Sequence, residues 1–147
     1  MDSAEFNEKS ILTTFFQDNA KAYVITLCST LIELWYTLTV LDVIEVNFMM
    51  GIITFLNIIL LFTLFTAAVN IKIYSEKWAI NAIVIGFYAL LRAFVIIPVV
   101  VRPYEKLAFN IGMNVVLGAL LISAGFITLK VNKQRKPYID KMEKINE

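Results

Sequence analysis

Four long apolar runs dominate the chain, and a short polar segment separates each run from the next. The runs cover Ala22–Leu41, Phe48–Asn70, Trp78–Val101 and Leu107–Val131. A helix needs about 20 residues to cross the hydrocarbon core of a bilayer, and every run is long enough to do so. Membrane-spanning strands are about 9–11 residues long and alternate in polarity, unlike these runs. The pattern predicts an all-α integral membrane protein, a bundle of four transmembrane helices.

The N-terminal segment, residues 1–20, has a different pattern. It is polar but carries an apolar stripe at helical spacing, made of Ile11, Leu12, Phe15 and Phe16. This spacing predicts a short amphipathic helix, which either lies on the membrane surface or packs on the bundle, and a disordered tail is the lesser alternative. The segment lacks the basic start and short apolar core of a cleaved secretory signal, so we expect the first run to remain as a span.

The predicted domain organisation follows from these patterns. Residues 21–131 form the transmembrane domain, and residues 132–147 form a basic cytoplasmic tail. The links between the runs are short, which predicts that consecutive helices are antiparallel neighbours. Pro98 lies near the outer end of the third run, where it is expected to kink or end the helix.

Lysine and arginine are unevenly distributed over the ends and links. With Lys21 counted at the N-terminal end and Lys130 counted with the tail, the N-terminal segment, the second link and the tail contain ten of them, the first link contains none and the third contains two. Cytoplasmic segments are enriched in these residues, so the bias predicts a multi-pass protein of the cell membrane with both termini in the cytoplasm. The tail either enforces this topology or meets anionic lipid headgroups.

Composition restricts the chemistry. Hydrophobic residues make up 59% of the 147 residues, more than the core of so small a domain can hide from water. The net charge of +1 does not point to nucleic acid as a partner. The sequence has no histidine and one cysteine, Cys28, and it lacks the common phosphate-loop and metal motifs. We therefore expect no metal, no cofactor and no catalytic residue, and an enzyme is disfavoured.

Two charges lie well inside the apolar runs, Glu33 in the first and Arg92 in the third. A central charge costs about 2.5–3.5 kcal/mol and usually faces the bundle interior, a partner or water. Glu33 lies about 17 Å and Arg92 about 21 Å from the ends of their helices on the same side of the membrane. Because these depths match, the two residues can form an ion pair.

Other polar residues share helix faces with these charges and predict a polar bundle interior. They are Thr30 and Thr37 in the first run, Asn57 in the second, Asn81 and Tyr88 in the third, and Asn114 in the fourth. Three interpretations of Glu33 and Arg92 remain open: a structural pair that fixes helix register, the lining of an ion or substrate path, or an Arg92 that extends to the outer headgroups.

Small residues form ridges on two runs. The ridge on the third consists of Ala82, Gly86, Ala89 and Ala93, and a shorter one on the fourth consists of Ala119 and Ser123. Such ridges let helices approach closely, either within the chain or across a dimer face.

Three function classes are compatible with these features. The first is a non-enzymatic subunit of a homo-oligomer or a larger membrane complex. The second is a small transporter or channel that uses Glu33 and Arg92. The third is a lipid-binding membrane protein with membrane lipids as its partners.

Overall fold

The computed structural model describes residues 19–41, 48–100 and 106–146. Its helices are α2 (Ala20–Leu41), α3 (Phe48–Lys72), α4 (Glu76–Leu91), the π-helical segment η1 (Arg92–Ile96), α5 (Ile97–Val100) and α6 (Leu107–Asn146). Four stretches of these residues are long and apolar enough to span a membrane. The predicted all-α, four-span bundle of a multi-pass membrane protein is therefore confirmed. The amphipathic helix predicted for residues 1–20 lies outside the described residues, except for Asn19 and for Ala20, which begins α2.

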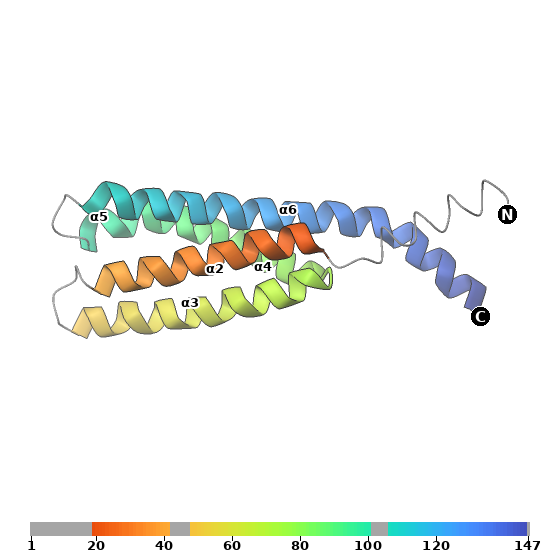
Figure 1. Ribbon diagram of the computed structural model, residues 1–147, viewed down its shortest axis with the longest axis horizontal. Helices are drawn as coiled ribbons and strands as arrows, with labels where there is room; N and C mark the ends of the chain where they lie inside the picture. Colours follow the sequence, from red (N-terminus) through yellow and green to blue (C-terminus); the bar gives the residue numbers. More distant parts are fainter. Residues whose placement is uncertain (1–18, 42–47, 101–105, 147) are drawn as a thin grey trace.

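The long helices lie side by side as antiparallel rods (Figure 1). The most extensive contact joins α4 to α6, followed by α2 with α3 and α2 with α6. The contact between α3 and α4 is much smaller, although only three residues connect these helices. A short link alone therefore does not determine how closely two consecutive helices pack.

The α4–α6 contact depends on small residues. The predicted ridge on the third span is buried, and its Gly86 faces Gly118 of α6. A Cβ atom on Gly118 would lie 2.7 Å from the carbonyl oxygen of Gly86, and one on Gly125 would lie 2.6 Å from that of Ala79. The small residues Ala119 and Ser123 are exposed, so the ridge predicted on the fourth span faces away from the bundle. Gly118 and Gly125 supply the close approach on α6 instead.

The third span contains a π-helical turn just before Pro98. The backbone N–H of Ile97 donates to the carbonyl of Arg92, five residues back. Proline has no N–H, and its ring collides with the carbonyl four residues back, so a widened turn before Pro98 relieves the conflict. The helix then continues as α5 to Val100. Pro98 therefore does not end the helix, and its observed effect is a local change of hydrogen-bond register.

Helix α6 is longer than the fourth apolar run. Its 40 residues rise about 60 Å, roughly twice the thickness of the hydrocarbon core. It continues past Val131 with Pro137 inside it, so the basic tail is a helical extension of the last span. The extension leaves the bundle at the end where α2 begins (Figure 1).

That end of the bundle is tied together by Asn19. Its backbone N–H donates to the carbonyl of Lys72 at 3.0 Å, and its side-chain amide donates to Thr128 Oγ1 at 2.9 Å. Asn19 thus joins the start of α2 to the last residue of α3 and to α6. Unpaired carbonyls at a helix end need such donors.

Candidate functional site

The candidate site is the buried polar cluster around Arg92, at the junction of α4 and η1. Arg92 is 3% exposed and the carboxylate residue opposite it, Glu33 on α2, is 0% exposed. Among the described residues, Arg92 and Glu33 form the ion pair that the structure places inside the bundle. The structure therefore brings together the two charges that the sequence predicts at matching depth.

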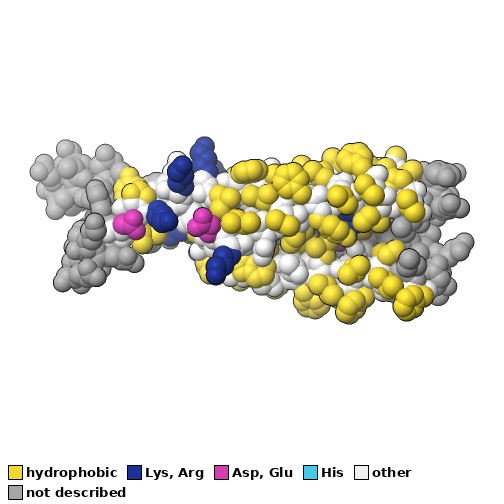
Figure 2. All heavy atoms as spheres, turned by 180° about the vertical axis from the view of Figure 1, so that it is seen from behind, with side chains coloured by type: hydrophobic (Ala, Val, Ile, Leu, Met, Phe, Trp, Pro, Cys, Tyr) yellow, Lys and Arg dark blue, Asp and Glu magenta, His cyan; other side chains and the backbone are white. Residues whose placement is uncertain are grey.

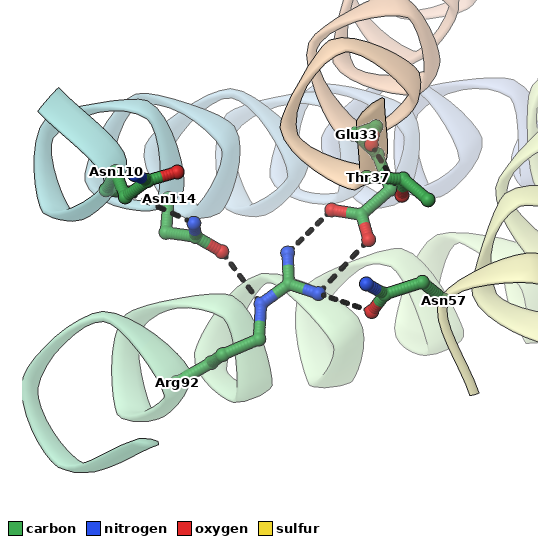
Figure 3. A network of polar contacts seen from close by, with 6 residues as sticks. All are labelled: Glu33, Thr37, Asn57, Arg92, Asn110 and Asn114. Carbon is green, nitrogen blue, oxygen red and sulfur yellow. Dashed lines mark hydrogen bonds and ion pairs between the residues drawn. The ribbon is translucent and has the colours of Figure 1, made fainter. Parts of the chain in front are cut away.

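Arg92 donates hydrogen bonds to residues of all three other spans (Figure 3). Its two terminal nitrogens reach the two carboxylate oxygens of Glu33, with Nη1 to Oε1 at 2.9 Å. Nη1 also donates to Asn57 Oδ1 on α3 at 3.1 Å, and Nε donates to Asn114 Oδ1 on α6 at 2.6 Å. We call Glu33, Asn57, Arg92 and Asn114 the Arg92 network.

A ladder of amides extends the network along α6. Asn114 Nδ2 donates to the carbonyl of Asn110 at 2.9 Å, and Asn110 Nδ2 donates to the carbonyl of Lys106 at 2.8 Å. Within the described part of the chain, the buried Oδ1 of Asn110 has no hydrogen-bond partner. The two asparagines therefore differ. Both the oxygen and the nitrogen of the Asn114 side-chain amide form hydrogen bonds, whereas in the described part of the chain the Asn110 amide forms one through its nitrogen.

Aromatic rings border the guanidinium group. The Cζ atom of Arg92 lies 4.2 Å from the ring centroid of Tyr36 and 5.7 Å from that of Tyr88. A cation placed near an aromatic face is attracted by the ring quadrupole, more strongly where water is excluded. Tyr36 is buried, so it covers the network on the α2 side.

The predicted interior residues occupy different environments. Asn57, Asn114 and Thr37 are buried, and the Thr37 hydroxyl donates to the carbonyl of Glu33 at 2.8 Å. Thr30 is half-buried, and its hydroxyl also donates to a carbonyl one turn back on α2. The two threonines therefore satisfy their hydroxyls on their own helix.

The placement of two predicted interior residues on α4 needs correction. Asn81 is exposed, and Tyr88 is 39% exposed although its ring approaches Arg92. Helix α4 packs mainly against α6 and only loosely against α3, and its buried positions are small residues, so Asn81 and Tyr88 remain on the exposed side. Arg92 differs from both residues, because it is buried and its side chain extends to Glu33 on α2 and Asn114 on α6.

Sequence reasoning missed two residues. Tyr36 stands three residues after Glu33, on the same side of the first span, and that spacing is the one signal for its contact with the site. Asn19 falls within the predicted N-terminal segment. Its signal is a position shortly before the first apolar run, where asparagine commonly caps a helix.

Two surface grooves flank the network, and both have apolar linings. One, of about 540 Å³, lies between α2 and α6 and includes Trp35, Phe109 and Gly112. The other, of about 500 Å³, lies between α3 and α4 and includes Thr63 and Tyr88. No group of three His, Cys, Asp or Glu side chains suited to a metal ion occurs in residues 19–41, 48–100 and 106–146.

Comparison with known proteins found no matching family model, no matching curated protein and no matching solved structure. The Arg92 network and the surface of the bundle are therefore the basis for a proposed function.

Proposed function

We propose that this protein is a non-enzymatic membrane component that acts as a subunit of a homo- or hetero-oligomeric assembly. The observation that carries the proposal is the closure of the Arg92 network. Arg92 donates four hydrogen bonds, and their acceptors come from α2, α3 and α6. A guanidinium has five N–H groups, so little donor capacity remains for a substrate.

A closed network favours a structural role for the two charges. Its geometry fixes the rotation of all four spans, since a turn of any helix would withdraw one partner from Arg92. Buried polar groups that specify register are a known use of such pairs. A bundle held in this way presents a rigid outer surface to the bilayer and to other membrane proteins.

The outer surface supports an assembly role. Large apolar side chains cover the bundle (Figure 2), as expected for helices in lipid. The small, exposed residues Ala108 and Gly112 of α6 line the α2–α6 groove and leave room in it. A Cβ atom on Gly112 would meet nothing within 4 Å. We propose the cell membrane as the location, with both termini in the cytoplasm, on the basis of the lysine and arginine bias.

The test is the mass of the protein extracted from its native membrane in mild detergent, measured by native mass spectrometry. Binding to a second copy or to a larger unrelated chain is the expected result. A monomer at every protein concentration, with no co-purifying chain after mild crosslinking in the membrane, would overturn the proposal. Because Cys28 is exposed and is the one cysteine in the sequence, Cys28→Ser gives a cysteine-free background for crosslinking from Gly112→Cys.

A second candidate function is a small transporter or channel, favoured by the loose contact between α3 and α4. The groove between these helices includes Tyr88, whose ring lies 5.7 Å from Arg92 Cζ. Separation of α3 from α4 would expose Arg92 and Glu33 from this side. In proteoliposomes, a transporter would lose substrate- or proton-coupled flux on Glu33→Gln while its folded yield stays normal. If the network is structural instead, Glu33→Gln lowers the folded yield.

A further inference from the structure

Basic side chains gather at one end of the bundle. Lys21 lies at the start of α2, Lys72 at the end of α3 and Lys77 at the start of α4, and all three are exposed. The exposed Lys130, Lys133 and Lys136 follow on α6. In Figure 2, lysine and arginine side chains appear where the apolar surface ends. We call Lys21, Lys72, Lys77, Lys130, Lys133 and Lys136 the basic collar.

The depth of the collar matches the lipid headgroups. Leu107 begins α6 at the opposite end of the bundle, and Lys130 lies about 35 Å further along the helix. The hydrocarbon core is about 30 Å thick, and the headgroup layer adds about 5–8 Å on each side. Lys130 therefore lies at the level of the headgroups, and Lys133 and Lys136 follow on its aqueous side at steps of about 4.5 Å.

The α6 extension is anchored where it carries these lysines. The guanidinium of Arg135 stacks on Tyr74, with 3.8 Å from Cζ to the ring centroid. Tyr74 lies in the turn between α3 and α4 and has a positive φ of 63°, a conformation that favours glycine. The turn nevertheless closes in this geometry, because the N–H groups of Tyr74 and Ser75 donate to the carbonyls of Ile71 and Asn70.

Two further contacts order the same region. Thr128, two residues before Lys130, accepts a hydrogen bond from Asn19 at 2.9 Å. The ammonium group of Lys72 lies 5.8 Å from the ring centroid of Tyr23. The helices that carry the collar are therefore fixed before any ligand arrives, which lowers the entropy cost of binding.

Among the side chains that the structure describes at this end, the charge balance is positive. The side chains that the structure describes there include two carboxylates, those of Glu76 and Asp140, against the six lysines of the collar and Arg135. Lysines near a membrane surface attract anionic lipids. We propose that the basic collar is a docking surface for the headgroup phosphates of anionic phospholipids, which goes beyond the subunit role. The competing explanation is that these lysines set the topology during insertion and bind no particular lipid.

The test is lipid binding by the purified full-length protein in a non-ionic detergent. Phosphatidylglycerol and phosphatidylcholine with the same acyl chains are titrated separately, and bound lipids are counted by native mass spectrometry. We expect tighter binding of phosphatidylglycerol, and we expect the preference to weaken as salt increases. The variant K130Q/K133Q/K136Q should weaken phosphatidylglycerol binding roughly fivefold per lysine at low salt.

Two matched variants make the result interpretable. K130R/K133R/K136R keeps the charge and should keep the preference, while Lys106→Gln changes an exposed lysine at the opposite end and should have no effect. Equal binding of the two lipids by the wild type would overturn the proposal, as would a preference that survives the triple glutamine change. Loss of the preference in both triple variants would also overturn it, because charge would then not be the cause.

Discussion

Arg92 and Glu33 meet in the middle of the bundle through two hydrogen bonds, one to each carboxylate oxygen. A planar guanidinium matches a carboxylate in this bidentate geometry, which an ammonium group cannot reproduce. The pair joins the first span to the third, and its neighbours Asn57 and Asn114 add the second and the fourth. Removal of one partner therefore leaves a buried charge without its counterion.

Glu33→Gln should destabilise the bundle strongly. The change leaves the Arg92 charge buried without its counterion, and breaking a buried pair from one side costs about 3–5 kcal/mol. We expect a lower folded yield and a lower midpoint of thermal unfolding in detergent, followed by tryptophan fluorescence. Adding Arg92→Leu to Glu33→Gln should recover part of the loss, because it removes the unpaired charge. A double variant less stable than Glu33→Gln would show that the pair is not the cause.

The two asparagines of α6 should respond differently to the same substitution. Asn114→Ala removes the acceptor of Arg92 Nε and should cost about 1.5–3 kcal/mol, the range for hydrogen bonds to charged groups. Asn110→Ala removes a side chain whose Oδ1 is buried without a partner among the described residues, so it should cost less than about 1 kcal/mol. Thermal unfolding of both variants in the same detergent measures the difference. Equal losses would contradict the role assigned to the Nε bond.

The length of the apolar runs is sufficient to predict the spans, because a helix needs a nearly fixed number of apolar residues to cross the bilayer. The contact between Glu33 and Arg92 can also be predicted from the sequence, because the depth and the helix face of each residue follow from its position within its own helix. The position of Asn81 cannot be predicted in this way. The exposure of Asn81 depends on which neighbouring helix the small residues of α4 pack against, and here that helix is α6. The sequence pattern of α4 alone does not determine this neighbour.

The continuation of α6 is hard to predict for a different reason. The residues after Val131 are charged, and Pro137 normally signals a helix end, because it removes a hydrogen bond. Here the helix has left the apolar bundle, and exposed positions around Pro137 allow water to satisfy the freed carbonyl. The stacking of Tyr36 on Arg92 is also beyond a sequence pattern, because it requires the relative rotation of two helices.

Asn19→Ala should loosen the end of the bundle that carries the basic collar. The side-chain amide donates to Thr128 and, at 3.4 Å, to the carbonyl of Ile71. Its removal should cost about 1–2 kcal/mol and increase hydrogen exchange at the start of α2. Thr128→Val is the matched variant, because it removes the acceptor and keeps the shape of the side chain. Unchanged exchange in both variants would contradict the link.

Gly118→Ala and Gly112→Ala should change stability in opposite directions, although both positions lie on α6. A Cβ atom on Gly118 would lie 2.7 Å from the backbone oxygen of Gly86, which cannot move without separating α4 from α6. Overpacking costs about 1–3 kcal/mol and outweighs the better helix propensity of alanine, so this variant should unfold at a lower temperature. A Cβ atom on Gly112 meets nothing within 4 Å, so alanine should raise stability by up to about 1 kcal/mol. If Gly118→Ala proved as stable as Gly112→Ala, the glycine contact would not set the distance between these helices.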